Sequence, residues 1–152
     1  MNTALSGCCE SKIVTLDGIP LSIDEPFKGA SQGALEFDWG KANSGSAALS
    51  VAILYSILRV GFPKKIEGVD NAEAQAMLNF REFQRQVIAH FPKEDFSRSI
   101  DVESWLLKHM PMHLQSDFVL CCYQERLRRR SISSNGAARR DPETIDRANA
   151  EL

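Results

Sequence analysis

The chain has 152 residues, a mass of 16.9 kDa, a net charge of −2 and an isoelectric point near 5.9. This length fits one domain with its own hydrophobic core and a tail. With 43% hydrophobic and 25% charged residues, the composition is that of a globular protein. The near-balanced charge excludes a chain that binds nucleic acid or membrane through its overall charge, so any such contact must be local.

Apolar runs in the sequence are short. None reaches the roughly 18 residues that would span a bilayer, and the longest, residues 47–60, contains Ser50, Ser56 and Arg59. The first ten residues lack a basic segment followed by an apolar stretch, so we expect no secretory signal. The sequence therefore predicts a cytoplasmic protein without membrane contact.

The four cysteines form two adjacent pairs, Cys8–Cys9 and Cys121–Cys122. Neighbouring cysteines rarely bridge each other because the bond geometry is strained, and nothing indicates an oxidising compartment. Structural zinc sites usually have two to four residues between successive cysteines, whereas these cysteines are adjacent. We therefore expect reduced thiols, no metal site and no cofactor.

The first third of the chain carries three predicted strands. Residues 1–11 are small and polar, and we expect them to be flexible. Residues 12–16 alternate as a short strand, Asp17-Gly18 is a hairpin turn signal, and residues 19–23 return as a second strand with Pro20 on an edge. Residues 35–39 alternate again, which predicts a third strand.

Four helices are predicted beyond these strands. Residues 47–60 are apolar on most sides, which is typical of a buried central helix. A second helix is expected from Asp70 or Asn71 to about His90, and a third begins after Ser99 or Asp101 and ends before Pro111. A fourth is expected to begin at Ser116, and Phe96 is expected in a short extended piece.

These elements predict an α+β fold in which a small antiparallel sheet of two or three strands packs on about four helices. We place the domain at residues 12–130, between a flexible N-terminus (residues 1–11) and a polar, charged tail (residues 131–152). In that tail the composition shifts from an arginine-rich to an acidic segment.

Several motifs resemble a family of unknown function found in bacteria, phages and plasmids. They are Val14-Thr-Leu-Asp-Gly-Ile-Pro-Leu21, Phe37-Asp-Trp-Gly40, Ser44-Gly45 and Leu49-Ser-Val-Ala-Ile-Leu54. The family pattern is V-x-V-D-G-x-x-L followed by F-[ED]-W-G-Y-G-G-S-G-P-x-x-L-A-x-A-I-L, and the match covers about residues 12–110. This chain departs from it at residues 41–43 and at Ser46. The resemblance implies a mobile-element context and no particular chemistry.

One loop is a candidate ligand site. Glycines and serines before a helix expose backbone N–H groups, and the helix N-terminus favours an anion. The candidate residues are Trp39, Lys41, Asn43, Ser44, Gly45 and Ser46, with the lysine as a positive charge and the tryptophan as a flat face for a base. The alternative is a tight connection in which glycine makes the turn and serine caps the helix.

A second candidate is the arginine-rich segment 126–140, which contains six arginines and no acidic residue. Arg126, Arg129 and Arg130 project from one side of a helix and could contact an acidic protein face or phosphates. The alternative is a solvated helix end. No arrangement of nucleophile, base and acid is recognisable, so we predict no catalytic residues and no enzyme activity.

The leading functional hypothesis is a non-catalytic protein-binding module of a mobile genetic element. Its partner would be a host protein, and its specific version is a counter-defence inhibitor of a host immune system. One alternative is a small module that binds an anion or nucleotide through the 39–46 loop. The other is a nucleic-acid contact through residues 126–140.

Overall fold

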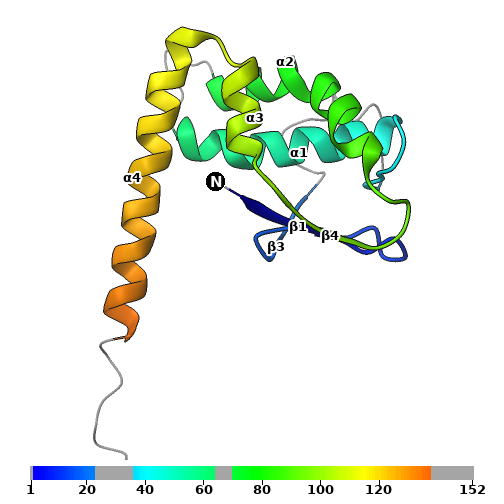
Figure 1. Cartoon of the computed structure of the whole chain (residues 1–152), viewed down its shortest axis with the longest axis horizontal. Helices are drawn as coiled ribbons and strands as arrows, with labels where there is room; N and C mark the ends of the chain where they lie inside the picture. The colour runs from blue at the N-terminus through cyan, green and yellow to red at the C-terminus, as the bar shows by residue number, and fades with distance from the viewer. Residues whose placement is uncertain (1, 23–35, 64–69, 138–152) are drawn as a thin grey trace, which may run out of the picture.

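The computed structural model describes residues 2–22, 36–63 and 70–137, and it has the predicted α+β fold (Figure 1). Within these residues, a four-stranded antiparallel sheet has the order β3-β2-β1-β4, one strand more than the upper predicted number. The strands are β1 (Thr3–Gly7), β2 (Val14–Leu16), β3 (Ile19–Pro20) and β4 (Phe96–Ile100). The helices are α1 (Ser44–Gly61), α2 (Asn71–Gln86), α3 (Val102–His109) and α4 (Met112–Ala137), with a 3₁₀ turn η1 (Ile88–His90) after α2.

The hairpin predicted between residues 12 and 23 is confirmed at its turn. Asp17 and Gly18 have φ values of +50° and +80°, so both adopt the left-handed conformation that tight hairpin turns require. Pro20 lies in the edge strand β3, where its missing N–H interrupts no ladder. The returning strand is shorter than predicted: it ends at Pro20, and Ile23 lies outside the described residues.

The prediction of a flexible N-terminus is wrong for residues 3–7, which form β1 between β2 and β4. Thr3, Leu5 and Gly7 are buried there, in strict alternation with more exposed residues. Of these three residues only Leu5 has a large apolar side chain, so the β propensity of the segment is low. Pairing on both sides stabilises the strand in spite of this low propensity.

The predicted strand at residues 35–39 is absent from the described part of that range, residues 36–39. Phe37 and Trp39 are buried, so the alternation does mark an inward-facing side. The backbone, however, lies against the first turn of α1 instead of joining the sheet. A Cβ added at Gly45 would lie only 2.9 Å from the carbonyl oxygen of Glu36. This close approach shows that the segment is tightly packed on α1.

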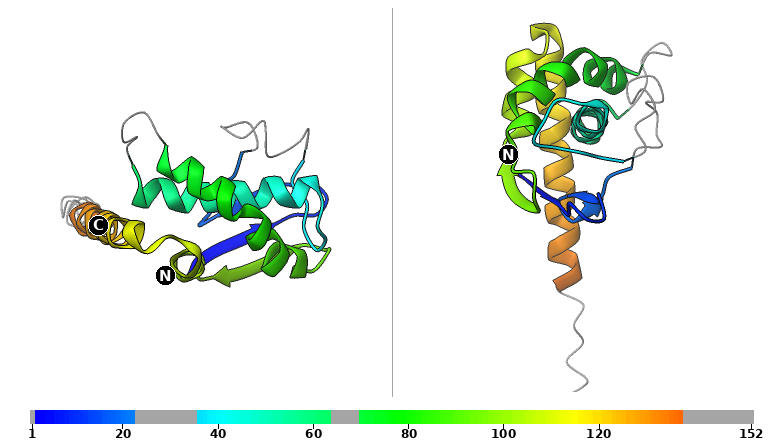
Figure 2. Two further views of the ribbon diagram at one scale, coloured as in Figure 1. Left: turned by 90° about the horizontal axis from the view of Figure 1, so that it is seen from above. Right: turned by 90° about the vertical axis from the view of Figure 1, so that its right-hand side faces the viewer.

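Helix α1 is the centre of the core, as predicted from its apolar composition (Figure 2). Its fully buried side chains include Leu49, Ile53, Leu54 and Leu58. By length and composition it is the one helix among the described residues that could cross a membrane, and 61% of that window is buried inside the fold. This degree of burial is typical of a helix in the core of a folded domain.

Helices α2 and α3 begin where acidic caps were predicted. The side chain of Asp70 accepts a hydrogen bond from the N–H of Glu73, and that of Asp101 accepts one from the N–H of Ser104. Each cap satisfies an amide at a helix start that has no partner within the helix. Helix α2 ends at Gln86, earlier than the predicted His90, which lies in η1.

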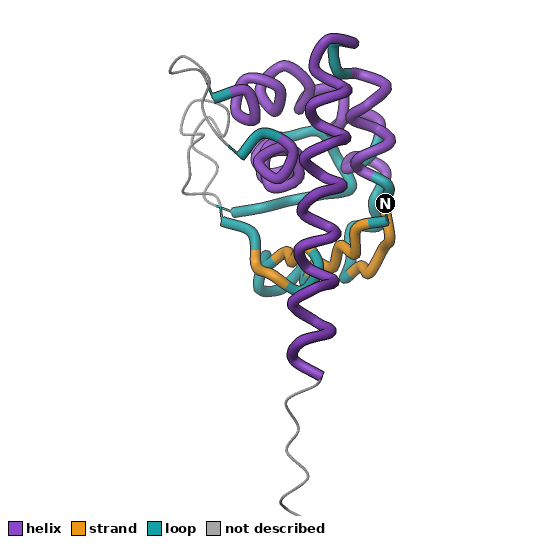
Figure 3. Tube along the Cα trace, turned by 90° about the vertical axis from the view of Figure 1, so that its left-hand side faces the viewer, coloured by secondary structure: helices purple, strands orange, loops and turns teal. Residues whose placement is uncertain are grey.

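Helix α4 is longer than predicted at both ends. It begins at Met112 directly after Pro111, whose ring is tolerated at a helix start because no amide is needed there. It continues to Ala137, so the first part of the predicted tail (residues 131–152) is helical, and residues 138–152 lie outside the described part. The C-terminal half of α4 extends past the sheet (Figures 1 and 3).

Candidate functional site

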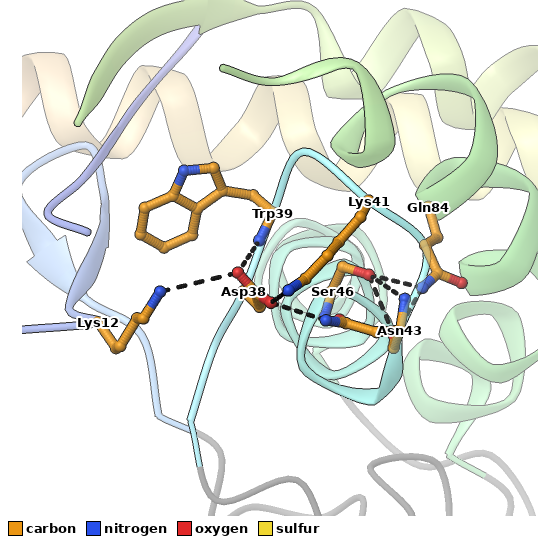
Figure 4. Close-up of polar contacts among 7 residues, drawn as sticks. All are labelled: Lys12, Asp38, Trp39, Lys41, Asn43, Ser46 and Gln84. Atoms are coloured by element: carbon orange, nitrogen blue, oxygen red, sulfur yellow. Dashed lines mark hydrogen bonds and ion pairs between the residues drawn. The ribbon is translucent and has the colours of Figure 1, made fainter. Parts of the chain in front are cut away.

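The loop before α1 is organised around a residue that the candidate list did not contain, Asp38 (Figure 4). Its carboxylate accepts hydrogen bonds from the backbone N–H of Trp39 at 3.0 Å and from Nδ2 of Asn43 at 2.6 Å. It also pairs with Nζ of Lys41 at 3.0 Å and with Nζ of Lys12 at 3.7 Å. One carboxylate thus joins the loop to the β1–β2 connection.

These contacts change the acidity of Asp38. Partial burial by itself raises the pKa of a carboxyl group. Hydrogen bonds from Asn43 and Lys41 and from the amide of Trp39 outweigh the burial and hold the pKa of Asp38 below its ordinary value. The group is therefore ionised at neutral pH and compensates the charge of Lys41.

The start of α1 is closed by a reciprocal pair of hydrogen bonds. The side chain of Asn43 accepts from the N–H of Ser46, and the hydroxyl of Ser46 accepts from the N–H of Asn43, both at 2.9 Å. This is a capping box. Gln84 from α2 adds two more bonds, donating to the carbonyl of Asn43 at 2.8 Å and to the Ser46 hydroxyl at 2.7 Å.

Trp39 lies in the core and not on the surface. Its side chain is only 2% exposed, and its indole N–H donates to the carbonyl of Glu94 at 3.0 Å. The edge of the ring contacts Phe96, with centroids 5.1 Å apart, and Nζ of Lys12 lies 5.2 Å from the centroid. The prediction that this ring offers a flat face to a base is therefore wrong.

The candidate loop is thus held by contacts within the protein. Asn43 and Ser46 cap α1 and Gly45 permits close packing, while Lys41 is compensated by Asp38 and Ser44 is exposed. These roles match the alternative of a tight connection. Lys12, Asp38 and Gln84 were not among the candidates drawn from the sequence. Lys12 and Gln84 contact residues that are distant in the sequence, and no local motif marks Asp38.

The predicted arginine cluster on α4 is partly neutralised. Arg126 donates to the carboxylate of Glu103 on α3. Arg128 and Arg129 both bind Glu125 on their own helix, at 2.7 and 2.8 Å. Hydrogen bonds from Arg128 and Arg129 lower the pKa of Glu125 to about 2. The cluster therefore presents less free positive charge than the sequence indicates.

A row of exposed apolar side chains follows α4 on the side away from the core. Leu120, Tyr123 and Leu127 are 55%, 54% and 44% exposed. Their spacing of three and four residues places them on one face of the helix, and the buried Phe118 and Cys122 lie on the far side. We call Leu120, Tyr123 and Leu127 the outer stripe.

The cysteines form no metal site in the described residues, where no group of three or more metal-binding side chains converges. All four are free thiols. Burial, with the nearby carboxylate of Glu103, raises the pKa of Cys122 to about 11. The hydrogen bond from the Ser11 side chain lowers the pKa of Cys8, whereas the bond to Asp95 raises that of Cys9.

The comparisons with known proteins show no match: no protein-family model, no curated protein and no solved structure is similar to this chain. The resemblance described from residues 12–110 therefore stays a prediction.

Proposed function

We propose that the chain is a non-catalytic protein-binding module and that the outer stripe of α4 is the centre of its interface. The observation that carries this proposal is the exposure of Leu120, Tyr123 and Leu127 on a helix whose opposite side is already docked through Phe118. A helix in contact with the core on one side needs only one apolar face. A second apolar face, exposed to solvent, indicates that the helix also binds another molecule.

The charges beside the stripe define the chemistry of that partner. By helical position, Arg126 and Arg130 border the outer stripe, and Arg129 follows on the side of Arg126. Apolar anchors with arginines at the rim are typical of protein interfaces. Arg126 and Arg129 already bind Glu103 and Glu125. A guanidinium has five N–H donors, however, so these arginines can also bind polar or acidic groups of a partner. We propose a host protein with an apolar surface flanked by such groups in that role.

The specific version of the proposal is a counter-defence protein of a mobile genetic element. In that version the partner belongs to a nucleic-acid-guided or nucleotide-signalled immune system of the host. Its support is the small size of the chain and the motif resemblance to a family found in phages and plasmids. It extends the binding proposal but is not needed for it.

Affinity capture from a host lysate tests the interface with two double variants of equal charge. Leu120→Asp with Leu127→Asp adds two acidic groups on the outer stripe. The control, Ile19→Asp with Leu78→Asp, adds two at exposed apolar positions of β3 and α2, outside α4. We expect one dominant, stoichiometric protein with the wild type and the control variant, and its loss with the stripe variant.

Two outcomes would contradict the proposal. One is capture that is equally strong with both variants, because the interface would then lie elsewhere. The other is an eluate that contains only the bait. Circular dichroism and thermal unfolding of each variant establish that the fold is retained, which we expect because all four substituted side chains are exposed.

A further inference from the structure

One edge of the sheet is open. In the order β3-β2-β1-β4, strand β4 has β1 as its only neighbour among the described residues, and it lies at the margin of the sheet in Figure 2. The three central residues of β4, Ser97, Arg98 and Ser99, are all exposed. An edge strand presents backbone groups that can pair with another chain.

The strand register shows which backbone groups face outward. In an antiparallel ladder, the N–H and C=O groups of alternate residues point to opposite sides. The carbonyl of Ala4 accepts a hydrogen bond on the β2 side, so the groups of Leu5 point toward β4. Leu5 lies opposite Arg98, whose groups therefore face β1. The backbone groups of Ser97 and Ser99 therefore point away from β1, toward the open edge of the sheet.

A surface groove of about 370 Å³ lies beside this edge, between β4 and the end of α2 with η1. Its lining residues are Gln86, Val87, His90 and Phe91 on the helical side and Arg98 to Ile100 on β4. Val87 and Phe91 give it an apolar surface. The groove can receive a side chain from a strand that pairs with β4.

The charges that line the groove indicate which kind of peptide strand can pair with β4. None of its lining residues is acidic, and the guanidinium of Arg98 lies over the Phe91 ring, 5.5 Å from the centroid. Arg98 forms no ion pair with any residue that the structure describes. Pairing two copies of β4 symmetrically about this residue would place like charges opposite each other, which is unfavourable, whereas a carboxylate there is favourable.

We propose that the β4 edge and the adjacent groove bind an extended peptide segment of a partner protein. The segment adds a fifth strand through the backbone groups of Ser97 and Ser99, places an acidic side chain opposite Arg98 and inserts an apolar side chain into the groove. Strand addition of this kind takes its affinity from main-chain hydrogen bonds and its specificity from side-chain pockets. The site uses elements other than α4 and does not depend on the outer stripe.

A displayed library of random peptides of about 12 residues, panned on the full chain, tests this site. The key variant is Ser99→Pro, which removes an outward-facing N–H without breaking the β1–β4 ladder. The charge-reversal variant is Arg98→Glu, and Lys108→Glu on α3 is its exposed control. The thermal unfolding midpoint of each variant shows whether the fold is retained.

We expect enriched peptides with an alternating apolar pattern and an acidic residue. Their affinity should fall at least about tenfold in Ser99→Pro and Arg98→Glu and stay unchanged in Lys108→Glu. A lysine at the acidic position should restore binding to Arg98→Glu. The proposal is overturned if no peptide is enriched, if the enriched peptides bind Ser99→Pro equally well, or if the free chain is a dimer whose Ser97 and Ser99 amides are protected from hydrogen exchange.

Discussion

Phe118 of α4 lies directly against Gly61, the last residue of α1. A Cβ atom added at Gly61 would be 2.0 Å from Cδ2 of the Phe118 ring, a distance that the packing does not permit. The same ring contacts Phe62, with centroids 5.6 Å apart. This contact fixes α4 against the end of α1 and leaves its outer stripe exposed.

Replacing Gly61 with alanine should destabilise the protein by displacing α4. We expect a loss of about 1–3 kcal/mol in the free energy of unfolding, the usual cost of overpacking a core. The measurement is chemical denaturation followed by circular dichroism. Adding Phe118→Leu to this variant should recover part of the loss, because the smaller side chain leaves room for the new methyl group. Strictly additive effects of the two substitutions would contradict the proposed contact.

The network at Asp38 predicts a graded set of stability losses. Asp38→Ala leaves the side-chain amide of Asn43 without its acceptor and should cost about 1–3 kcal/mol. Asn43→Ala removes the helix cap, at about 1 kcal/mol. Lys41→Ala removes an exposed ion-pair partner, and should cost less than about 1 kcal/mol. Urea denaturation of the three variants measures the order of these losses. A loss in Lys41→Ala as large as that in Asp38→Ala would contradict this description of the network.

Asp38 should also contribute to the pH dependence of stability. Its pKa is lower in the folded than in the unfolded chain, so its stabilisation is present at neutral pH. That stabilisation should be lost as the pH falls below about 4, through the folded pKa. Unfolding curves of the wild type and Asp38→Asn should therefore converge at acidic pH. A difference that is constant between neutral and acidic pH would contradict the lowered pKa.

The thiols should react at different rates. The hydrogen bond from the Ser11 side chain lowers the pKa of Cys8, whereas burial raises that of Cys122 to about 11. Because the thiolate is the reactive form, iodoacetamide at mildly alkaline pH should modify Cys8 first and Cys122 last. Tandem mass spectrometry resolves the positions. Ser11→Ala should slow the reaction at Cys8, and an unchanged rate would show that the hydroxyl has no such influence.

The alternative of a nucleotide site at the 39–46 loop predicts a thermal shift with a phosphate-bearing compound. We expect none across a broad nucleotide panel, because the Trp39 ring is buried and Asp38 compensates Lys41. A saturable shift that disappears in Lys41→Ala would establish the ligand site and overturn this expectation.

The alternative of a nucleic-acid contact predicts binding through residues 126–140 with a steep salt dependence. Because Glu125 holds Arg128 and Arg129, we expect the wild type to bind a duplex oligonucleotide weakly. Glu125→Gln releases both guanidinium groups and should raise the affinity roughly threefold to tenfold. Fluorescence anisotropy at several salt concentrations measures both. Tight, salt-sensitive binding by the wild type would favour the nucleic-acid alternative.

Local sequence patterns were sufficient to predict much of the fold. The hairpin turn at Asp17-Gly18, the cap at Asp70 and the central helix α1 each depend on neighbouring residues, so the sequence contains the necessary information. Strand β1 could not be predicted in this way. Its small residues form a strand only because β2 and β4 pair with it on both sides.

The same distinction between local patterns and long-range contacts applies to the candidate sites. A serine cap at the start of α1 was among the alternatives drawn from the sequence, since a cap is a local structure. In the structure Ser46 fills this role together with Asn43. Gln84 bonds to both residues from 41 and 38 positions away, a relationship that only the packed fold creates. Likewise, an apolar residue such as Leu127 does not reveal by itself which side of its helix faces the core.

Site-specific photo-crosslinking in host cells is the most direct test of the protein-binding account. A photoreactive amino acid replaces Tyr123 in the outer stripe or, as the control, Leu78, which is 74% exposed on α2. The account predicts one discrete crosslinked protein from position 123 and little or none from position 78. Equal, diffuse labelling from both positions, or no crosslinked protein from position 123, would contradict it.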